Sequence, residues 1–107
     1  MDIYISLPIT GEDTGKARER ADLIKASLSR EGHRAVTPFD IHAGKNPTYG
    51  DRLAFDLRAM LSCDAVFFCK GWEQSLGCNI EHDAAMRSKS FAGRHPHARD
   101  FKILYER

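Results

Sequence analysis

Short apolar runs alternate with longer amphipathic stretches along this chain, a pattern typical of proteins in which strands and helices alternate. The apolar runs predict strands over residues 3–6, 35–37, 65–69 and 101–105. Residues 65–69 are apolar throughout, as expected of a central parallel strand that is covered on both faces. Turn-forming residues end the first three runs, namely Pro8 with Gly11, then Pro38 and then Gly71.

Three amphipathic stretches predict helices, over residues 13–30, 48–61 and 75–88. The apolar stripe of the first stretch is Ala17, Ala21, Ile24 and Leu28, and that of the second is Leu53, Leu57, Met60 and Leu61. Gly32 follows the first stretch and supplies a stop signal for that helix. Residues 91–99 are polar and rich in histidine, and we expect them to form a loop.

This order of elements predicts a single α/β domain over residues 1–107. We expect a Rossmann-like or flavodoxin-like three-layer sandwich, with a small parallel sheet of four to five strands and helices on both faces. In such sheets ligands bind beyond the carboxyl ends of the strands, at the point where the strand order reverses. The segments that leave those ends are residues 7–11, 38–40 and 70–77, so the functional site is expected there.

Composition narrows the classes of partner. The 16 Lys and Arg against 15 Asp and Glu give a net charge of +1, which favours neither a nucleic acid polymer nor a membrane surface. No apolar run is long enough to cross a bilayer, and residues 1–4 lack the features of a signal peptide, so we expect a cytoplasmic protein. Cys63, Cys69 and Cys78 lack C-x-x-C spacing, which predicts reduced thiols and no zinc site. No dinucleotide or Walker motif is present, and we expect no cofactor.

The most informative stretch is the start of the third predicted helix, Gly71-Trp72-Glu73-Gln74-Ser75-Leu76-Gly77-Cys78-Asn79-Ile80-Glu81. Ser75 is a favoured N-cap, and the free amides that follow it attract a phosphate or another oxyanion. Glu81 lies roughly 9 Å further along the helix and leans back over Gly77, which has no side chain. A sugar would fit this notch with its 5′ group near Ser75. The alternative is a solvent-facing glutamate on an ordinary capped helix.

Several segments resemble one known superfamily. The opening strand and loop are Tyr4-Ile5-Ser6-Leu7-Pro8-Ile9-Thr10-Gly11, and the third strand begins Cys63-Asp64-Ala65-Val66. Asp56 stands eight residues before Asp64, and the segment from Gly71 to Glu81 follows. In order and spacing these segments resemble the nucleoside 2-deoxyribosyltransferase-like proteins, which include the 2′-deoxynucleoside 5′-phosphate N-hydrolases. The resemblance covers about residues 2–85.

The resemblance implies nucleophilic catalysis by Glu81. Its carboxylate would attack the anomeric carbon, displace the base and leave a glycosyl-enzyme ester, which water or a second base would then resolve. Asp56 would assist the leaving base or bind the sugar hydroxyls. The alternative for Asp56 is a solvated side chain paired with Arg52. Tyr4 resembles the family's substrate-contacting tyrosine, and its alternative role is strand packing.

The substrate implied is a nucleoside or a nucleoside 5′-monophosphate, and the family's shared active sites imply a homo-oligomer. The predicted substrate-binding residues are Tyr4, Pro8, Ile9, Thr10, Phe39, Trp72, Ser75 and Gly77. Phe39 and Trp72 would sandwich the base, or else anchor their loops. The first loop departs from the phosphate-reading hydrolases, because Leu7, Pro8 and Thr10 replace their small and basic residues. Proline also lacks an amide donor, which keeps a free nucleoside or a modified nucleotide open as the substrate.

Weaker patterns leave other functions open. Asp40 and His42 lie on the rim of the expected site. His95-x-His97, with Arg94 and Arg99, would bind a metal or phosphate, or would simply form a basic loop. Adjacent helical residues diverge by about 100°, so Glu81-His82-Asp83 is not a metal site. A function of a different class, a non-catalytic nucleotide-binding or interaction module, also fits this sequence.

Overall fold

A parallel four-stranded sheet forms the middle layer of the computed structural model, which describes residues 1–92 and 100–107. Its strands are β1 (Asp2–Ser6), β2 (Arg34–Val36), β3 (Ala65–Phe68) and β4 (Lys102–Tyr105). They lie in the order β2-β1-β3-β4, and every neighbouring pair is parallel. The predicted Rossmann-like or flavodoxin-like α/β architecture is therefore confirmed, with four strands in the described part of the chain.

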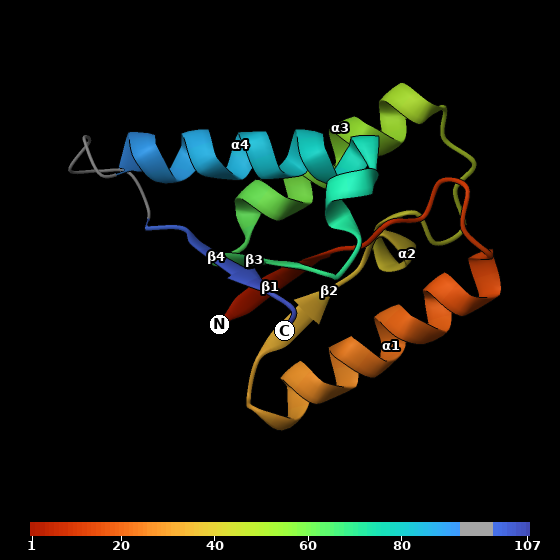
Figure 1. The fold of residues 1–107 in the computed structure, drawn as a ribbon, viewed down its shortest axis with the longest axis horizontal. Coiled ribbons are helices and arrows are strands. Elements are labelled where there is room, and N and C mark those ends of the chain that lie inside the picture. Colours follow the sequence, from red (N-terminus) through yellow and green to blue (C-terminus); the bar gives the residue numbers. More distant parts are fainter. Residues whose placement is uncertain (93–99) are drawn as a thin grey trace.

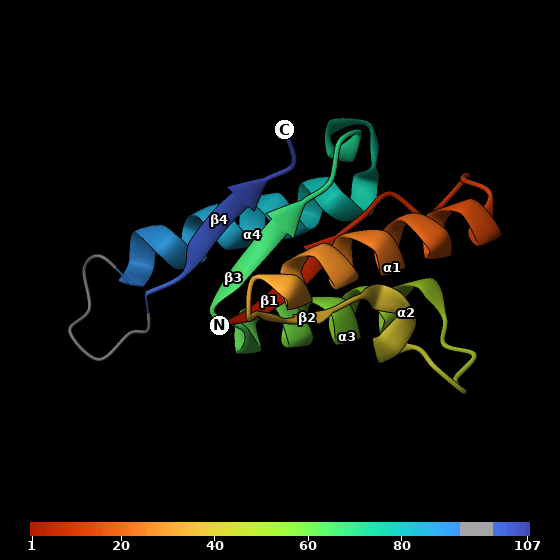
Figure 2. The ribbon, with the colours of Figure 1, turned by 90° about the horizontal axis from the view of Figure 1, so that it is seen from below.

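Helices cover both faces of this sheet (Figure 1). Helix α1 (Thr14–Arg30) lies on one face, and α3 (Tyr49–Ser62) and α4 (Leu76–Ala92) lie on the other. Figure 2 shows α1 crossing in front of the strands, with α3 and α4 behind them. Two short elements follow strand ends, the helix α2 (Pro38–Ile41) after β2 and the 3₁₀ turn η1 (Trp72–Gln74) after β3. The chain thus leaves the sheet through short, ordered segments at the end where a site was expected.

Strand β1 supplies side chains to both layers, because successive residues of a strand point to opposite faces. Ile3 and Ile5 belong to the core that packs under α1, whereas Tyr4 belongs to the core shared with α3 and α4. All three side chains are fully buried. Ser6 has the same parity as Tyr4 and is also fully buried. The α3–α4 side of β1 therefore carries two hydroxyl groups inside the protein.

The structure differs from the sequence predictions at several element boundaries. Thr37 is not the end of β2 but the N-cap of α2, since its hydroxyl accepts from Asp40 N and its own N–H donates to the Asp40 carboxylate. Helix α4 runs to Ala92, beyond the predicted end at residue 88, so Phe91 is helical. The prediction that Leu61 belongs to the core stripe is wrong. It is 46% exposed because it follows the fully buried Met60 and points away from it.

Other predictions concern segments without a described structure or features that the structure lacks. His95 and His97 lie outside the described residues. Within residues 1–92 and 100–107, no helix has the length and apolar character needed to cross a membrane. The same residues contain no cluster of three potential metal-binding side chains. Cys63, Cys69 and Cys78 are buried and form no disulfide.

Candidate functional site

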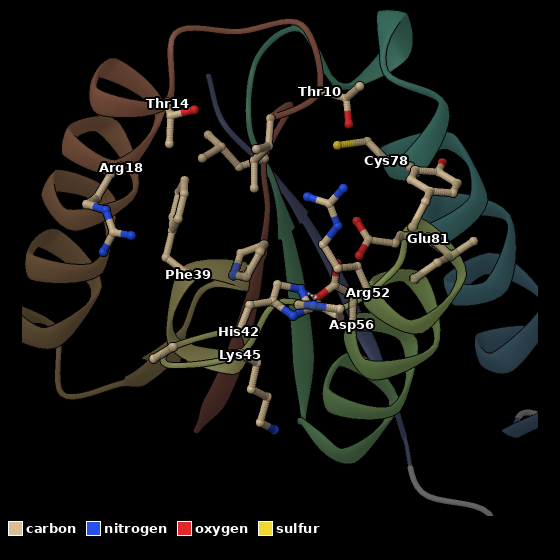
Figure 3. Close-up of a pocket in the computed structure, with 18 of the residues that line it drawn as sticks. Thr10, Thr14, Arg18, Phe39, His42, Lys45, Arg52, Asp56, Cys78 and Glu81 are labelled. Carbon is tan, nitrogen blue, oxygen red and sulfur yellow. Dashed lines mark ion pairs between the residues drawn. The ribbon is translucent and has the colours of Figure 1, made fainter.

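A cavity of about 490 Å³ lies at the carboxyl ends of β1 and β2, between the loop after β1, the segment from α2 to α3, and the start of α4 (Figure 3). Strands β2 and β3 lie on opposite sides of β1, so this is the point where the strand order reverses. Most of the predicted site residues line it, namely Tyr4, Ile9, Thr10, Phe39, Asp56, Ser75, Gly77 and Glu81. The fold thus brings together side chains from β1, its following loop, α2, α3 and α4.

Glu81 is held in the wall of this cavity by two hydroxyl groups of β1. The Tyr4 hydroxyl donates to Oε2 at 2.5 Å, and the Ser6 hydroxyl donates to Oε1 at 2.7 Å. The glutamate is only 4% exposed. Both carboxylate oxygens therefore have donors, which fixes the orientation of the group. The interpretation of Glu81 as an ordinary solvent-facing glutamate is wrong.

Burial shifts the protonation of these groups. Desolvation raises the pKa of Glu81 to about 7, against the lowering effect of the bonds from Tyr4 and Ser6, and the charge of Asp56 raises it further. The pKa of Tyr4 is also raised well above its usual value, chiefly by burial and then by the charge of Glu81. Tyr4 consequently remains a hydrogen-bond donor, while Glu81 is divided between its acid and carboxylate forms near neutral pH.

The start of α4 leaves open space beside this carboxylate. Cys78 N donates to the Ser75 hydroxyl at 3.3 Å, which confirms that Ser75 caps the helix. A Cβ at Gly77 would meet only the Ser75 hydroxyl, at 4.0 Å, so no other side chain fills the notch. The Asn79 amide donates to the carbonyl groups of Trp72, Glu73 and Ser75 and fixes the turn that precedes the helix.

Asp56 of α3 lies against His42, the residue that ends α2. Asp56 Oδ1 and His42 Nε2 are 2.8 Å apart, so the partner of Asp56 in the structure is His42 rather than Arg52, and burial favours the neutral form of both side chains. Desolvation raises the pKa of Asp56 to about 7, although Arg52 lowers it. The pKa of His42 is lowered, first by desolvation and then by the charges of Arg52 and Lys45. A carboxyl group and an imidazole therefore lie close together, with pKa values displaced in opposite directions.

Three cationic side chains also line the cavity, Arg18 from α1, Lys45 from the loop after α2 and Arg52 from α3. Arg18 and Phe39 lie on the side opposite Glu81 (Figure 3). The Arg18 guanidinium lies 4.7 Å from the centre of the Phe39 ring. Because burial favours the neutral form of the two carboxyl groups in this cavity, the cations give it a positive balance that suits an anionic ligand.

Two predicted site residues, Pro8 and Trp72, are not among the described residues that line the cavity. The Trp72 ring stacks on His82, with ring centres 4.2 Å apart, and packs near Phe68 and Tyr105. His82 Nε2 lies 2.7 Å from the Tyr105 hydroxyl, which ties this aromatic cluster to β4. Pro8 packs beside Gly71. The structure therefore does not bring Trp72 and Phe39 to the two sides of one ligand.

Ser6 and the basic side chains are site residues that sequence reasoning missed. A signal for Ser6 was present, since it lies two residues after Tyr4 on a strand and must share its face. For Arg18, Lys45 and Arg52 the only signal was their place on segments that border strand ends. The predicted divergence of Glu81, His82 and Asp83 is confirmed, because Asp83 points away and pairs with Arg87 on the surface.

The fold and site define an α/β domain with a buried, hydroxyl-bound carboxylate in a cavity at the switch point of its sheet. A family model described as a domain of unknown function, DUF4406, matches residues 1–90, and the chain belongs to this family. No curated protein matches the chain.

Proposed function

We propose that this domain cleaves the N-glycosidic bond of a nucleoside or nucleotide, as a member of the nucleoside 2-deoxyribosyltransferase-like superfamily. The observation that carries the proposal is the Glu81 carboxylate, buried in a cavity wall, oriented by Tyr4 and Ser6, and next to the open notch at Gly77. A carboxylate kept in this setting is suited to nucleophilic attack, because its charge is stabilised by only two neutral donors.

In the first step a Glu81 oxygen attacks the anomeric carbon, and the carbon–nitrogen bond breaks with its electron pair on the base. The developing positive charge on the sugar is stabilised by the adjacent carboxylate, as in retaining glycosidases. The Tyr4 and Ser6 hydroxyls each donate a hydrogen bond to one carboxylate oxygen of Glu81. These bonds fix the carboxylate so that the attacking oxygen faces the anomeric carbon. Water then attacks the glycosyl ester and frees the sugar, or a second base takes the sugar instead.

The proposed substrate is either a nucleoside 5′-monophosphate or a free nucleoside. The capped start of α4 and the cations Arg18, Lys45 and Arg52 favour a ligand with negative charge. We also propose that the protein acts in a reducing compartment such as the cytoplasm, since its three buried cysteines form no disulfide. A homo-oligomer remains a prediction from the resemblance.

The test is chromatographic detection of free base from a panel of ribonucleosides, deoxyribonucleosides and their 5′-monophosphates, with and without an added acceptor base. Wild type is compared with Glu81→Gln, which keeps the shape of the side chain. Glu73→Gln is the matched control, because Glu73 is exposed and lies outside the cavity. Base release by wild type and Glu73→Gln but not by Glu81→Gln supports the proposal. Equal release by all three proteins refutes it.

A second candidate is a non-catalytic nucleotide-binding module. It is favoured by the departure of the first loop from the phosphate-reading hydrolases, where Leu7, Pro8 and Thr10 replace their small and basic residues. Such a module would gain thermal stability from a nucleotide without releasing base, and Glu81→Gln would gain as much as wild type. Pairing the melting assay with the chromatographic assay separates the two functions.

A further inference from the structure

Strand β4 forms one edge of the sheet in the described part of the chain, since the strand order ends there. Lys102 N and Glu106 N donate to carbonyl groups of the neighbouring β3 segment. In a parallel ladder the backbone groups of alternate residues point to the same side. The N–H and C=O groups of Ile103 and Tyr105 therefore point away from β3, and no residue within 1–92 or 100–107 bonds to them.

The two edges of the sheet differ in how they are protected. At the other edge, β2 has only three residues and the chain turns into helix α2 at Pro38. Short edge strands and proline are common means of preventing strand addition. By contrast, β4 continues its hydrogen bonding as far as Glu106, and Figure 2 shows it at the margin of the sheet. Its middle residues are Ile103 and Leu104, both only half-buried. This edge is therefore a template for another strand.

We propose that β4 pairs with β4 of a second copy of this chain, antiparallel about a two-fold axis at Leu104, and so joins two sheets into one. The inference does not depend on the proposed function. A two-fold axis makes the same strand complementary to itself. With Leu104 on the axis, Ile103 faces Tyr105 of the second copy, and Tyr105 faces Ile103. Each of these pairs exchanges both of its outward N–H and C=O groups in hydrogen bonds.

The side chains of β4 favour this register over its two neighbours. Lys102 lies opposite Glu106 of the second copy at both ends of the paired segment. Facing opposite charges stabilise a strand pair, as does an aromatic side chain facing a β-branched one, here Tyr105 and Ile103. An axis at Ile103 would instead set Lys102 opposite Leu104, and an axis at Tyr105 would set Glu106 opposite Leu104. Only the axis at Leu104 gives every charged residue an oppositely charged neighbour.

Both charged residues are available for this contact. Glu106 Oε1 accepts from Arg20 at 2.6 Å and from Lys70 N at 2.8 Å, which fixes the carboxylate, while no described residue donates to Oε2. Lys102 is exposed and forms no ion pair with a described residue. No described residue of β3 or β4 lines the cavity, so the interface leaves it open. It is therefore distinct from an oligomer in which neighbouring subunits share an active site.

Disulfide trapping tests the register. Leu104→Cys places two thiols at a non-hydrogen-bonded pair on the axis, where the Cα atoms are about 4.5 Å apart and within reach of a disulfide. Lys102→Cys is the matched control, because its two copies would lie about 14 Å apart. Under mild oxidation, Leu104→Cys should form a covalent dimer on a non-reducing gel and Lys102→Cys should not. Equal trapping of both variants would overturn the register.

Sedimentation velocity over a range of concentrations tests the dimer itself, and wild type should show a monomer–dimer equilibrium. Ile103→Pro removes an outward N–H but no bond to β3. Lys102→Glu sets like charges opposite each other at both ends of the paired segment. Each variant should raise the dimer dissociation constant by about tenfold or more. Lys16→Glu makes the same charge change at an exposed position in the first turn of α1 and should leave the constant unchanged.

Circular dichroism establishes whether Ile103→Pro keeps its fold. Lys102→Glu alters only an exposed side chain, so it reports on the interface even if the proline variant unfolds. A wild type that stays monomeric at every concentration would overturn the proposal. A dimer that forms equally well in wild type and in Lys102→Glu would also overturn it, because the two copies would then meet through another surface.

Discussion

Replacing Glu81 by glutamine tests the buried carboxylate without any knowledge of the substrate. The pKa of Glu81 is raised from 4.5 to about 7 in the folded protein, so the folded state binds its proton more tightly than the unfolded state does. The free energy of unfolding therefore falls as the pH rises between these two values. At about 1.4 kcal/mol for each pKa unit, this loss amounts to about 3 kcal/mol above pH 7. Glutamine has no such proton, so the variant avoids the loss.

The assay is urea unfolding of wild type and Glu81→Gln at intervals from pH 4.5 to pH 8. We expect the stability of the variant relative to wild type to grow by about 3 kcal/mol across this range. Contributions from the histidines cancel in the comparison, and Glu73→Gln serves as the surface control. A relative stability that stays constant with pH would refute the assignment of a buried, destabilised carboxylate at this position.

Three further substitutions test individual contacts. Tyr4→Phe removes a donor to Glu81 Oε2, so it should cost about 1–3 kcal/mol in urea unfolding and move the rising limb of the pH–rate profile to higher pH; an unmoved limb would contradict it. Gly77→Ala should leave the fold intact or stabilise it by up to about 1 kcal/mol, yet weaken binding in a nucleoside titration, because its methyl group enters the notch; unchanged affinity would show that the notch is not used. Trp72→Leu should lower stability by about 1–3 kcal/mol while KM stays constant, and a higher KM would show contact with the substrate.

Local patterns were enough to predict most of the fold. The apolar runs and stripes place β1, α1, α3 and β3 within one or two residues of their observed bounds, because these elements bury a regular face. The cap at Ser75 also follows from the preference of serine for the N-cap position.

What the sequence did not predict depends on contacts between distant segments. Glu81 meets Ser6 across 75 positions of the chain, and only the packing of α4 on β1 determines that pair. His42 meets Asp56 because the capping box at Thr37 starts a short helix that no apolar periodicity reveals. Trp72 turns away from the cavity because Asn79 fixes the preceding turn through three carbonyl groups.

The alternation of side chains along β1 sends its aliphatic residues and its hydroxyl-bearing residues to opposite layers of the domain. Ile3 and Ile5 anchor α1, whereas Tyr4, Ser6 and the glutamate they hold lie in the opposite layer. Replacing those three polar residues with well-packed apolar ones would yield a more stable scaffold that lacks the buried carboxylate, since a buried charge weakens folding. A change to that trio leaves the packing of Ile3 and Ile5 under α1 untouched, so one face of β1 is free to vary without disturbing this contact.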